Sequence, residues 1–153
     1  MAQYAVEVQA TSNSTPATDD TFIELKGAAS TSFFLKRVRV SCNKAASDDL
    51  ATIRIITATG QGAGGTGYTP NKKRALAPAA TTTCNVKNTT SAFSVGAGAA
   101  TIDRVNMNGR AIWEWLPRGD EEYLDAGSAG IVQIVIQCNV ASVKFDVYAE
   151  FEE

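Results

Sequence analysis

Hydrophobic and polar residues alternate with a period of two along much of the chain. The clearest case is the segment 143–152, in which Val143, Phe145 and Val147 are separated by polar or charged residues. Successive side chains of a β-strand point to opposite faces, so this pattern predicts a long strand with one apolar face and one solvent-facing side.

The segment immediately before it, 131–138, shows the same alternation. Val132 and Ile134 fall on one face, and Gln133 falls on the other. Only residues 139–142 separate the two segments, a length typical of the turn of an antiparallel hairpin. We therefore expect the two C-terminal strands to pair with each other.

Further strands follow from the same pattern, and helical spacing is weak throughout. Asn108-Gly109 lies between two of these strands and is a dipeptide that favours a tight hairpin turn. About eight strands with polar turns between them indicate an all-β protein with antiparallel sheets, in a sandwich or barrel, with little or no helix. Apart from the two segments above, the predicted strands are 4–9, 22–25, 34–41, 51–58, 101–107 and 111–116.

Two long segments, about 60–80 and 89–100, lack the strand pattern. Loops of that length in a compact domain are usually functional or disordered. The first begins with Gly60-Gln61-Gly62-Ala63-Gly64-Gly65, which formally matches the dinucleotide fingerprint GxGxxG. That fingerprint requires a helix to begin at its last glycine, and 66–70 contains Gly and Pro instead. We interpret the segment as a flexible loop.

Composition limits the chemistry that the chain can perform. Its 153 residues suit a single domain spanning 1–153, and the formal net charge of −2 favours neither nucleic acid nor an anionic membrane. The sequence has no histidine, which excludes Ser-His-Asp, Cys-His and HExxH sites. The three cysteines lie far apart, so we expect no disulfide framework or zinc ribbon. Residues 1–8 resemble no leader peptide and no apolar run is long enough to span a membrane, so we expect a protein made in a reducing cytosol.

Two clusters of charged residues are candidate binding sites. Lys72-Lys73-Arg74, close to Tyr68, is the only basic cluster, and we interpret it as a solvated or partner-facing loop rather than a nucleic-acid site. The acidic segment 120–125 fits neither an EF-hand nor a pair of catalytic carboxylates, and we interpret it as a polar turn. We therefore expect no catalytic residue, metal or cofactor, and no enzymatic activity.

Trp113 and Trp115 share one face of a predicted strand, with Ile112, Glu114 and Leu116 on the other. Tryptophan combines a large apolar area with an N–H that needs a partner. The sequence leaves two interpretations open for each ring: a place in the core, or an exposed position as an interface anchor or sugar platform.

From Phe34 to Glu153 the chain resembles the small jelly-roll decoration (cement) proteins of tailed-phage capsids. The resemblance rests on strand and loop composition rather than on invariant chemistry. The segments that carry it are Leu35-Lys36-Arg37-Val38-Arg39-Val40, Ile53-Arg54-Ile55-Ile56-Thr57-Ala58, Thr69-Pro70, Leu76-Ala77, Ala80-Thr81-Thr82-Thr83, Gly109-Arg110-Ala111-Ile112-Trp113-Glu114-Trp115 and Val147-Tyr148-Ala149-Glu150-Phe151-Glu152-Glu153.

This resemblance implies a jelly-roll subunit, often a homotrimer, that is made in the host bacterium and binds the major capsid protein on the outside of the phage head. A carbohydrate- or receptor-binding sandwich of the virion is the alternative, and it requires exposed aromatic rings. For the first function we expect an apolar subunit contact and a polar capsid contact. We assign Trp115, Tyr123 and Phe93 to the subunit contact, and Tyr68, Lys72, Lys73 and Arg74 to the capsid contact.

Overall fold

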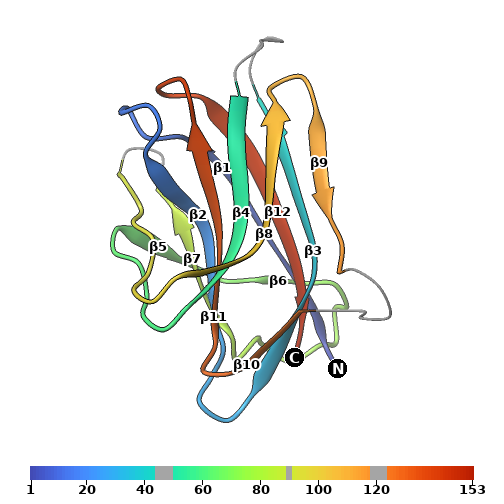
Figure 1. Ribbon diagram of the computed structural model, residues 1–153. Coiled ribbons are helices and arrows are strands. Elements are labelled where there is room, and N and C mark those ends of the chain that lie inside the picture. Colours follow the sequence, from blue (N-terminus) through green and yellow to red (C-terminus); the bar gives the residue numbers. More distant parts are fainter. Residues whose placement is uncertain (44–49, 89–90, 118–123) are drawn as a thin grey trace.

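The structure is a sandwich of two antiparallel β-sheets (Figure 1). This computed structural model describes residues 1–43, 50–88, 91–117 and 124–153, and within them it contains strands and no helix. The first sheet has the order β10-β3-β12-β1-β6, and β9 also pairs with β3. Its strands are β1 (Gln3–Thr11), β3 (Ser32–Cys42), β6 (Asn71–Lys72), β9 (Ile112–Trp115), β10 (Leu124–Ser128) and β12 (Lys144–Glu152).

The second sheet packs against the first and has the order β5-β7-β2-β11-β4-β8. Its strands are β2 (Asp19–Lys26), β4 (Leu50–Ala58), β5 (Gly65–Tyr68), β7 (Thr83–Lys87), β8 (Ala100–Asn108) and β11 (Ile131–Cys138). No helix in the described ranges is long and apolar enough to cross a membrane.

The connectivity is that of a jelly roll. The order β1-β12-β3-β9 in one sheet faces β2-β11-β4-β8 in the other, and the chain changes sheet at every step between these strands except from β4 to β8. Eight strands wound as two Greek keys define this fold. The excursion containing β5, β6 and β7 is inserted between β4 and β8. The sequence-based prediction of an all-β antiparallel sandwich of jelly-roll type is confirmed.

Both predicted hairpins are wrong. β11 pairs with β2 and β4, whereas β12 pairs with β1 and β3, so residues 139–142 carry the chain from one sheet to the other. The turn at Asn108 likewise links β8 in the second sheet to β9 in the first. A short polar turn reverses the chain direction in either case, and the turn sequence alone does not say which sheet the next strand joins.

Aromatic side chains fill the space between the sheets. Phe22 of the second sheet meets Phe145 of the first edge to face, with ring centroids 5.8 Å apart. Within the first sheet, Tyr4 stacks on Phe151 at 5.3 Å, and Phe33 meets the same ring at 6.0 Å. Offset-stacked and edge-to-face contacts of this kind add about 0.5–1.5 kcal/mol each to the burial of the rings.

A bulge in β3 sets which of its charged side chains face outward. The pairing of β3 with β12 shifts between Glu150 and Phe151, which leaves Lys36 without an opposite residue. Buried Leu35 and Val38 therefore both face the core, although they are three positions apart. As a result the neighbouring side chains of Lys36 and Arg37 both reach carboxylates on the outer face of the sheet.

The segment 60–80 is less loop-like than its composition predicts. It contains β5, which pairs with β7, and β6, which pairs with β1. Its glycine-rich start packs against the segment 91–99: Ser94 N–H donates to the carbonyl of Ala63 at 2.9 Å, and a Cβ on Gly62 would lie 2.0 Å from the Ser94 carbonyl oxygen. These glycines permit close packing of two loops, so the interpretation of a flexible loop is wrong.

Candidate binding surface

The basic cluster predicted from the sequence lies on the excursion between β5 and β7, residues 69–82. This excursion crosses to the first sheet, where Asn71 and Lys72 pair with Ala5 and Tyr4 as β6. Lys73 N–H donates to the carbonyl of Gln3 at 3.0 Å. The excursion is therefore tied to the N-terminal strand by its backbone.

The far end of the excursion is held by the C-terminal residue of the described chain. One carboxylate oxygen of Glu153 accepts hydrogen bonds from the Thr82 backbone N–H at 2.8 Å and from its hydroxyl at 2.6 Å. The other oxygen accepts from the Thr81 N–H at 2.5 Å. Between these anchors, the phenol of Tyr4 donates to the carbonyl of Pro78 at 3.1 Å. Both ends of the excursion are thus fixed to the sandwich.

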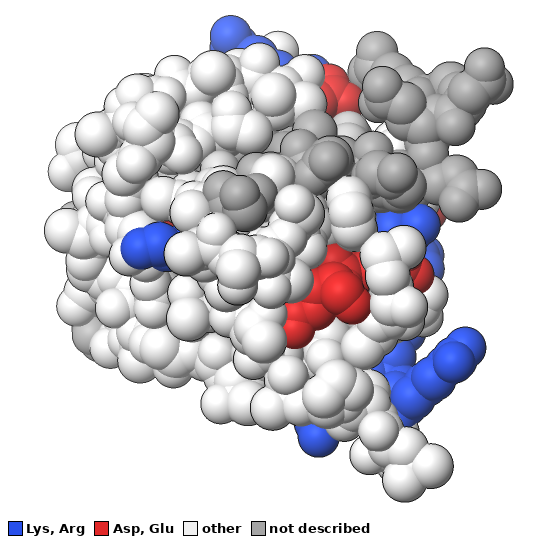
Figure 2. Space-filling view, turned by 90° about the horizontal axis from the view of Figure 1, so that it is seen from below, with Lys and Arg blue, Asp and Glu red and all other residues white. Residues whose placement is uncertain are grey.

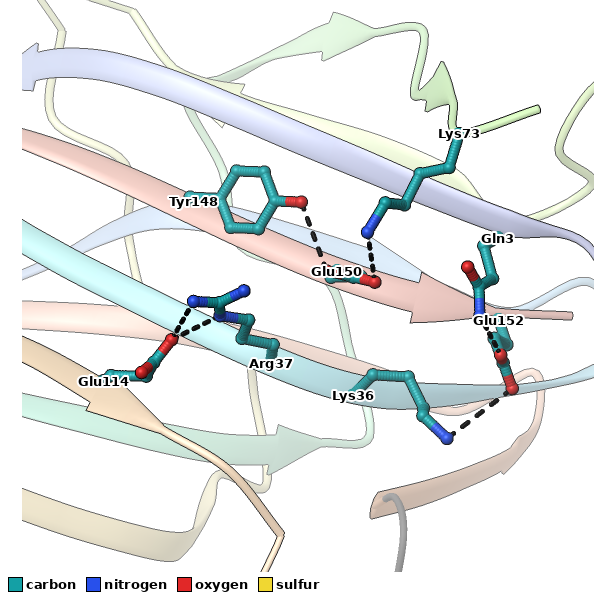
Figure 3. Close-up of polar contacts among 8 residues, drawn as sticks. All are labelled: Gln3, Lys36, Arg37, Lys73, Glu114, Tyr148, Glu150 and Glu152. Atoms are coloured by element: carbon teal, nitrogen blue, oxygen red, sulfur yellow. Dashed lines mark hydrogen bonds and ion pairs between the residues drawn. The ribbon is translucent and has the colours of Figure 1, made fainter. Parts of the chain in front are cut away.

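The three cations of the cluster differ in their contacts. The ammonium of Lys73 lies 2.5 Å from the carboxylate of Glu150, which also accepts a hydrogen bond of 3.2 Å from the phenol of Tyr148 (Figure 3). The hydrogen bond to Glu150 raises the pKa of Lys73. Lys72 and Arg74 are exposed, and neither has an ion pair with a described residue. Lys73 is therefore engaged by Glu150, whereas Lys72 and Arg74 are exposed cations without an ion pair to a described residue.

A shallow groove lies beside the excursion, at the end of the sandwich where both chain termini are found. Its volume is about 430 Å³. Leu76 is 100% exposed and Met1 is 80% exposed, and Figure 2 shows that most of this end of the molecule is uncharged. We call this feature the terminal groove; its lining residues are Met1, Ala2, Arg74, Leu76, Ala77, Pro78 and Glu153.

The aromatic residues predicted for a subunit contact are mostly not on the surface. Phe93 is 1% exposed and lies under Gly65, and Trp115 is 7% exposed and belongs to the core. These two predictions do not hold for the isolated chain, because the loops and strands of the chain itself already cover both rings. Tyr123 lies outside the described residues. Tyr68 is partly buried in β5, and its phenol oxygen accepts a hydrogen bond from the amide of Asn71 at 3.1 Å.

Exposed aliphatic side chains occur instead at the start of β4, in β8, and in and just after β9. In β9 Trp115 faces the core, so Ile112 and Leu116, which share the opposite face with Glu114, are exposed. The sequence shows that this strand has apolar residues on both faces, but it does not indicate which of the two faces is covered. We call the set the edge patch; it consists of Leu50 (54% exposed), Ile102 (46%), Ile112 (71%) and Leu116 (55%).

In the part of the chain that the structure describes, no cluster of three Cys, Asp or Glu side chains could hold a metal ion. Gly60 to Gly65 leads into β5 rather than into a helix. Comparison of the chain with protein-family models, with curated proteins and with solved structures gave no match.

Proposed function

We propose that the protein is a non-enzymatic decoration protein that binds the outside of an assembled phage capsid and stabilises the head by bridging capsid subunits. The jelly-roll fold is the one that the resemblance to such proteins implies. The observation that carries the proposal is the terminal groove, where fully exposed Leu76 stands on an excursion fixed at both ends.

The chemistry of the groove indicates what kind of surface it would bind. Burying a fully exposed leucine contributes about 1.5–3 kcal/mol. Because the excursion is fixed before binding, little conformational entropy is lost when a partner covers it. Exposed Arg74 lines the groove with Leu76, and exposed Lys72 lies two residues before it, so the complementary capsid surface would be apolar with acidic residues on this side.

Several copies acting together would make a modest contact sufficient. A homo-oligomer, for which we favour a trimer, raises the effective concentration of each further contact once the first has formed. Because the protein would bind the assembled shell and not the free subunits, its binding shifts the equilibrium towards the shell. We assign the subunit contact to the edge patch, in place of Trp115 and Phe93, because its side chains are exposed.

The alternative, a carbohydrate- or receptor-binding module, has less support. Sugar platforms of this kind need an exposed aromatic ring, and Trp115 is buried while Trp113 is partly buried. The partly exposed rings of Tyr68 and Tyr148 are both engaged, the first by Asn71 and the second by Glu150. A glycan array therefore serves as the counter-test to capsid binding.

The test is co-sedimentation of the purified protein with phage heads that lack it. We expect the natural protein to sediment with heads and the double variant Leu76→Ser/Arg74→Glu to remain in the supernatant. Lys144→Glu is the matched control, because Lys144 is also exposed but lies at the opposite end of β12 from the groove. Circular dichroism of all three proteins establishes that they are folded.

Two results would contradict the proposal. Failure of the natural protein to bind heads, together with a positive glycan array, favours the alternative. Equal head binding by the natural protein and the double variant removes the terminal groove from the contact. Sedimentation equilibrium of the natural protein and of Ile112→Ser tests the subunit contact separately, and a monomeric natural protein would exclude it.

A further inference from the structure

Two arginines stand directly opposite each other on the outer face of the second sheet. Arg54 of β4 and Arg104 of β8 are register partners in antiparallel strands. Like charges in directly opposite positions of an antiparallel pair destabilise it. A sheet that places two guanidinium groups in this way is expected to hold a counter-charge close to them.

Among the residues that the structure describes, only one of these arginines has a counter-charge. Arg54 forms an ion pair with Asp19 of β2. The exposed guanidinium of Arg104 makes no hydrogen bond or ion pair with any described residue. Two guanidinium groups and one carboxylate therefore leave one positive charge unbalanced at this place.

The arginines line a small polar cavity, and neighbouring strands supply its other walls. Its volume is about 100 Å³, and Asp19, Thr52, Arg54, Arg104 and Gln137 line it. Gln137 lies opposite both Asp19 and Thr52, so β2, β11 and β4 bring these three residues into one row across the sheet.

Two of the lining side chains are already fixed by hydrogen bonds. The hydroxyl of Thr52 donates to Asn106 at 2.8 Å, and the amide nitrogen of Gln137 donates to the carbonyl of Ala17 at 2.7 Å. The Thr52 and Gln137 walls of the cavity are therefore held in place by the chain itself.

We infer that this cavity binds a single carboxylate group, held by the guanidinium of Arg104 with support from Arg54. A guanidinium presents a planar pair of N–H donors that matches the two oxygens of a carboxylate. One negative charge balances the cavity, whereas the nearby Asp19 would repel the second charge of a phosphate or sulfate dianion. The volume suits the carboxylate of an acidic side chain or of a small free acid.

This inference does not depend on the terminal groove. The cavity lies towards the end of the sandwich away from the two termini, near the start of β2 and β4 and the end of β11 (Figure 1). Capsid binding through the groove and carboxylate binding in the cavity can therefore succeed or fail separately.

The experiment is a titration of the folded protein with sodium acetate at constant ionic strength, followed by the NMR signals of the arginine side-chain Nε–H groups. We expect saturable shifts of the Arg54 and Arg104 signals in the millimolar range. In Arg104→Gln, the affinity for acetate, followed by the remaining Arg54 signal, should fall by about tenfold or more, which corresponds to the loss of one charge-assisted contact. Lys72→Gln, which removes an exposed cation elsewhere, should leave it unchanged.

A parallel titration with glutamate blocked at both its amino and α-carboxyl groups identifies the source of the carboxylate. Binding at least as tight as that of acetate favours an acidic side chain of a protein partner, and weaker binding favours a small free acid. Sulfate that binds more tightly than acetate contradicts the inference, as do shifts that never saturate or that are equal in Arg104→Gln.

A second readout separates binding from a purely structural role. Without ligand, Arg104→Gln should raise the urea midpoint, because it removes the repulsion between the two guanidinium groups. Acetate at constant ionic strength should raise the midpoint of the natural protein and not that of the variant. A natural protein whose midpoint does not respond to acetate overturns the inference.

Discussion

The side-chain amide of Gln133 donates a hydrogen bond of 2.6 Å to the carboxylate of Glu24, and both residues are buried on the outer face of the second sheet. The same carboxylate accepts hydrogen bonds from Gly62 N–H at 2.8 Å and from the amides of Gln61 and Asn85 at 3.1 Å each. One acidic side chain thus anchors the glycine-rich loop to three strands of the sheet.

Glu24→Gln should destabilise the protein although it keeps the size of the side chain. An amide offers one acceptor oxygen in place of two, and its NH₂ group would face the donors that now surround Glu24. We expect a loss of about 3 kcal/mol in the free energy of unfolding, measured by urea denaturation. Glu7→Gln, at an exposed position on β1, should change it by less than about 0.5 kcal/mol. Equal stability of the two variants would contradict the anchoring role of Glu24.

Gly62→Ala should lower stability through a steric clash rather than through conformational preference. A Cβ at this position would lie 2.0 Å from the carbonyl oxygen of Ser94. We expect a cost of about 1–3 kcal/mol, because one of the two loops must move. Gly67→Ala is the matched control, since no atom lies within 4 Å of its added Cβ, and it should be neutral or stabilise by about 0.5 kcal/mol. A neutral Gly62→Ala would mean that the two loops are not packed in solution.

Stability should fall in alkaline solution, above about pH 10. Burial raises the pKa of Tyr4 and of Tyr148 above the usual 10.0, and the hydrogen bond to Glu150 raises that of Lys73 above 10.5. The folded state therefore binds more protons than the unfolded state in this range, and the stabilisation, complete below pH 10, is lost as the pH rises through the folded-state pKa values.

Urea midpoints measured between pH 8 and pH 11 test this expectation. Tyr148→Phe should make the decline shallower, because it removes one of the three groups and also the phenolate charge that helps to raise the pKa of Lys73. Lys72→Met, at the neighbouring exposed cation, should leave it unchanged. An increase in the free energy of unfolding with pH over this range would contradict the expected decline.

Cys84 should be unreactive in the folded protein. Burial, together with the charge of Glu24, raises the pKa of its thiol to about 12, so the reactive thiolate is scarce at pH 8. Cys138 is also buried, whereas Cys42 is partly exposed. An aromatic disulfide reagent at pH 8 should therefore label Cys42 first and the other two only after denaturation. Fast labelling of the folded Cys42→Ser variant would contradict the burial of Cys84 and Cys138.

The alternation of apolar residues was sufficient to predict individual strands. The segment 143–152 is β12 with Phe145, Val147 and Phe151 on its buried face, as its period of two requires. The same reasoning located β1, β4 and β11 and the all-β class. The alternation depends only on neighbouring residues, because it assigns each side chain to one of the two faces of its own strand.

Contacts between distant segments decided the rest. Gln133 occupies the face of β11 that alternation assigns to solvent, yet the segments 60–64 and 91–99 cover it. In β9 the tertiary structure buried Trp115 and exposed Ile112, a choice that apolar residues on both faces left open. Likewise, of the three neighbouring cations, Lys73 contacts Glu150, a residue 77 positions away in the sequence.

Sequence alone therefore determined the strongly alternating strands, such as β1, β4, β11 and β12, and the two faces of each, because these depend on neighbouring residues. Only the tertiary structure decided that β11 and β12 belong to different sheets, that Arg54 and Arg104 stand opposite each other, and that Leu76 is exposed. The physical reason is that strand pairing and the covering of a face are set by segments far apart in the chain, whose meeting no local period encodes.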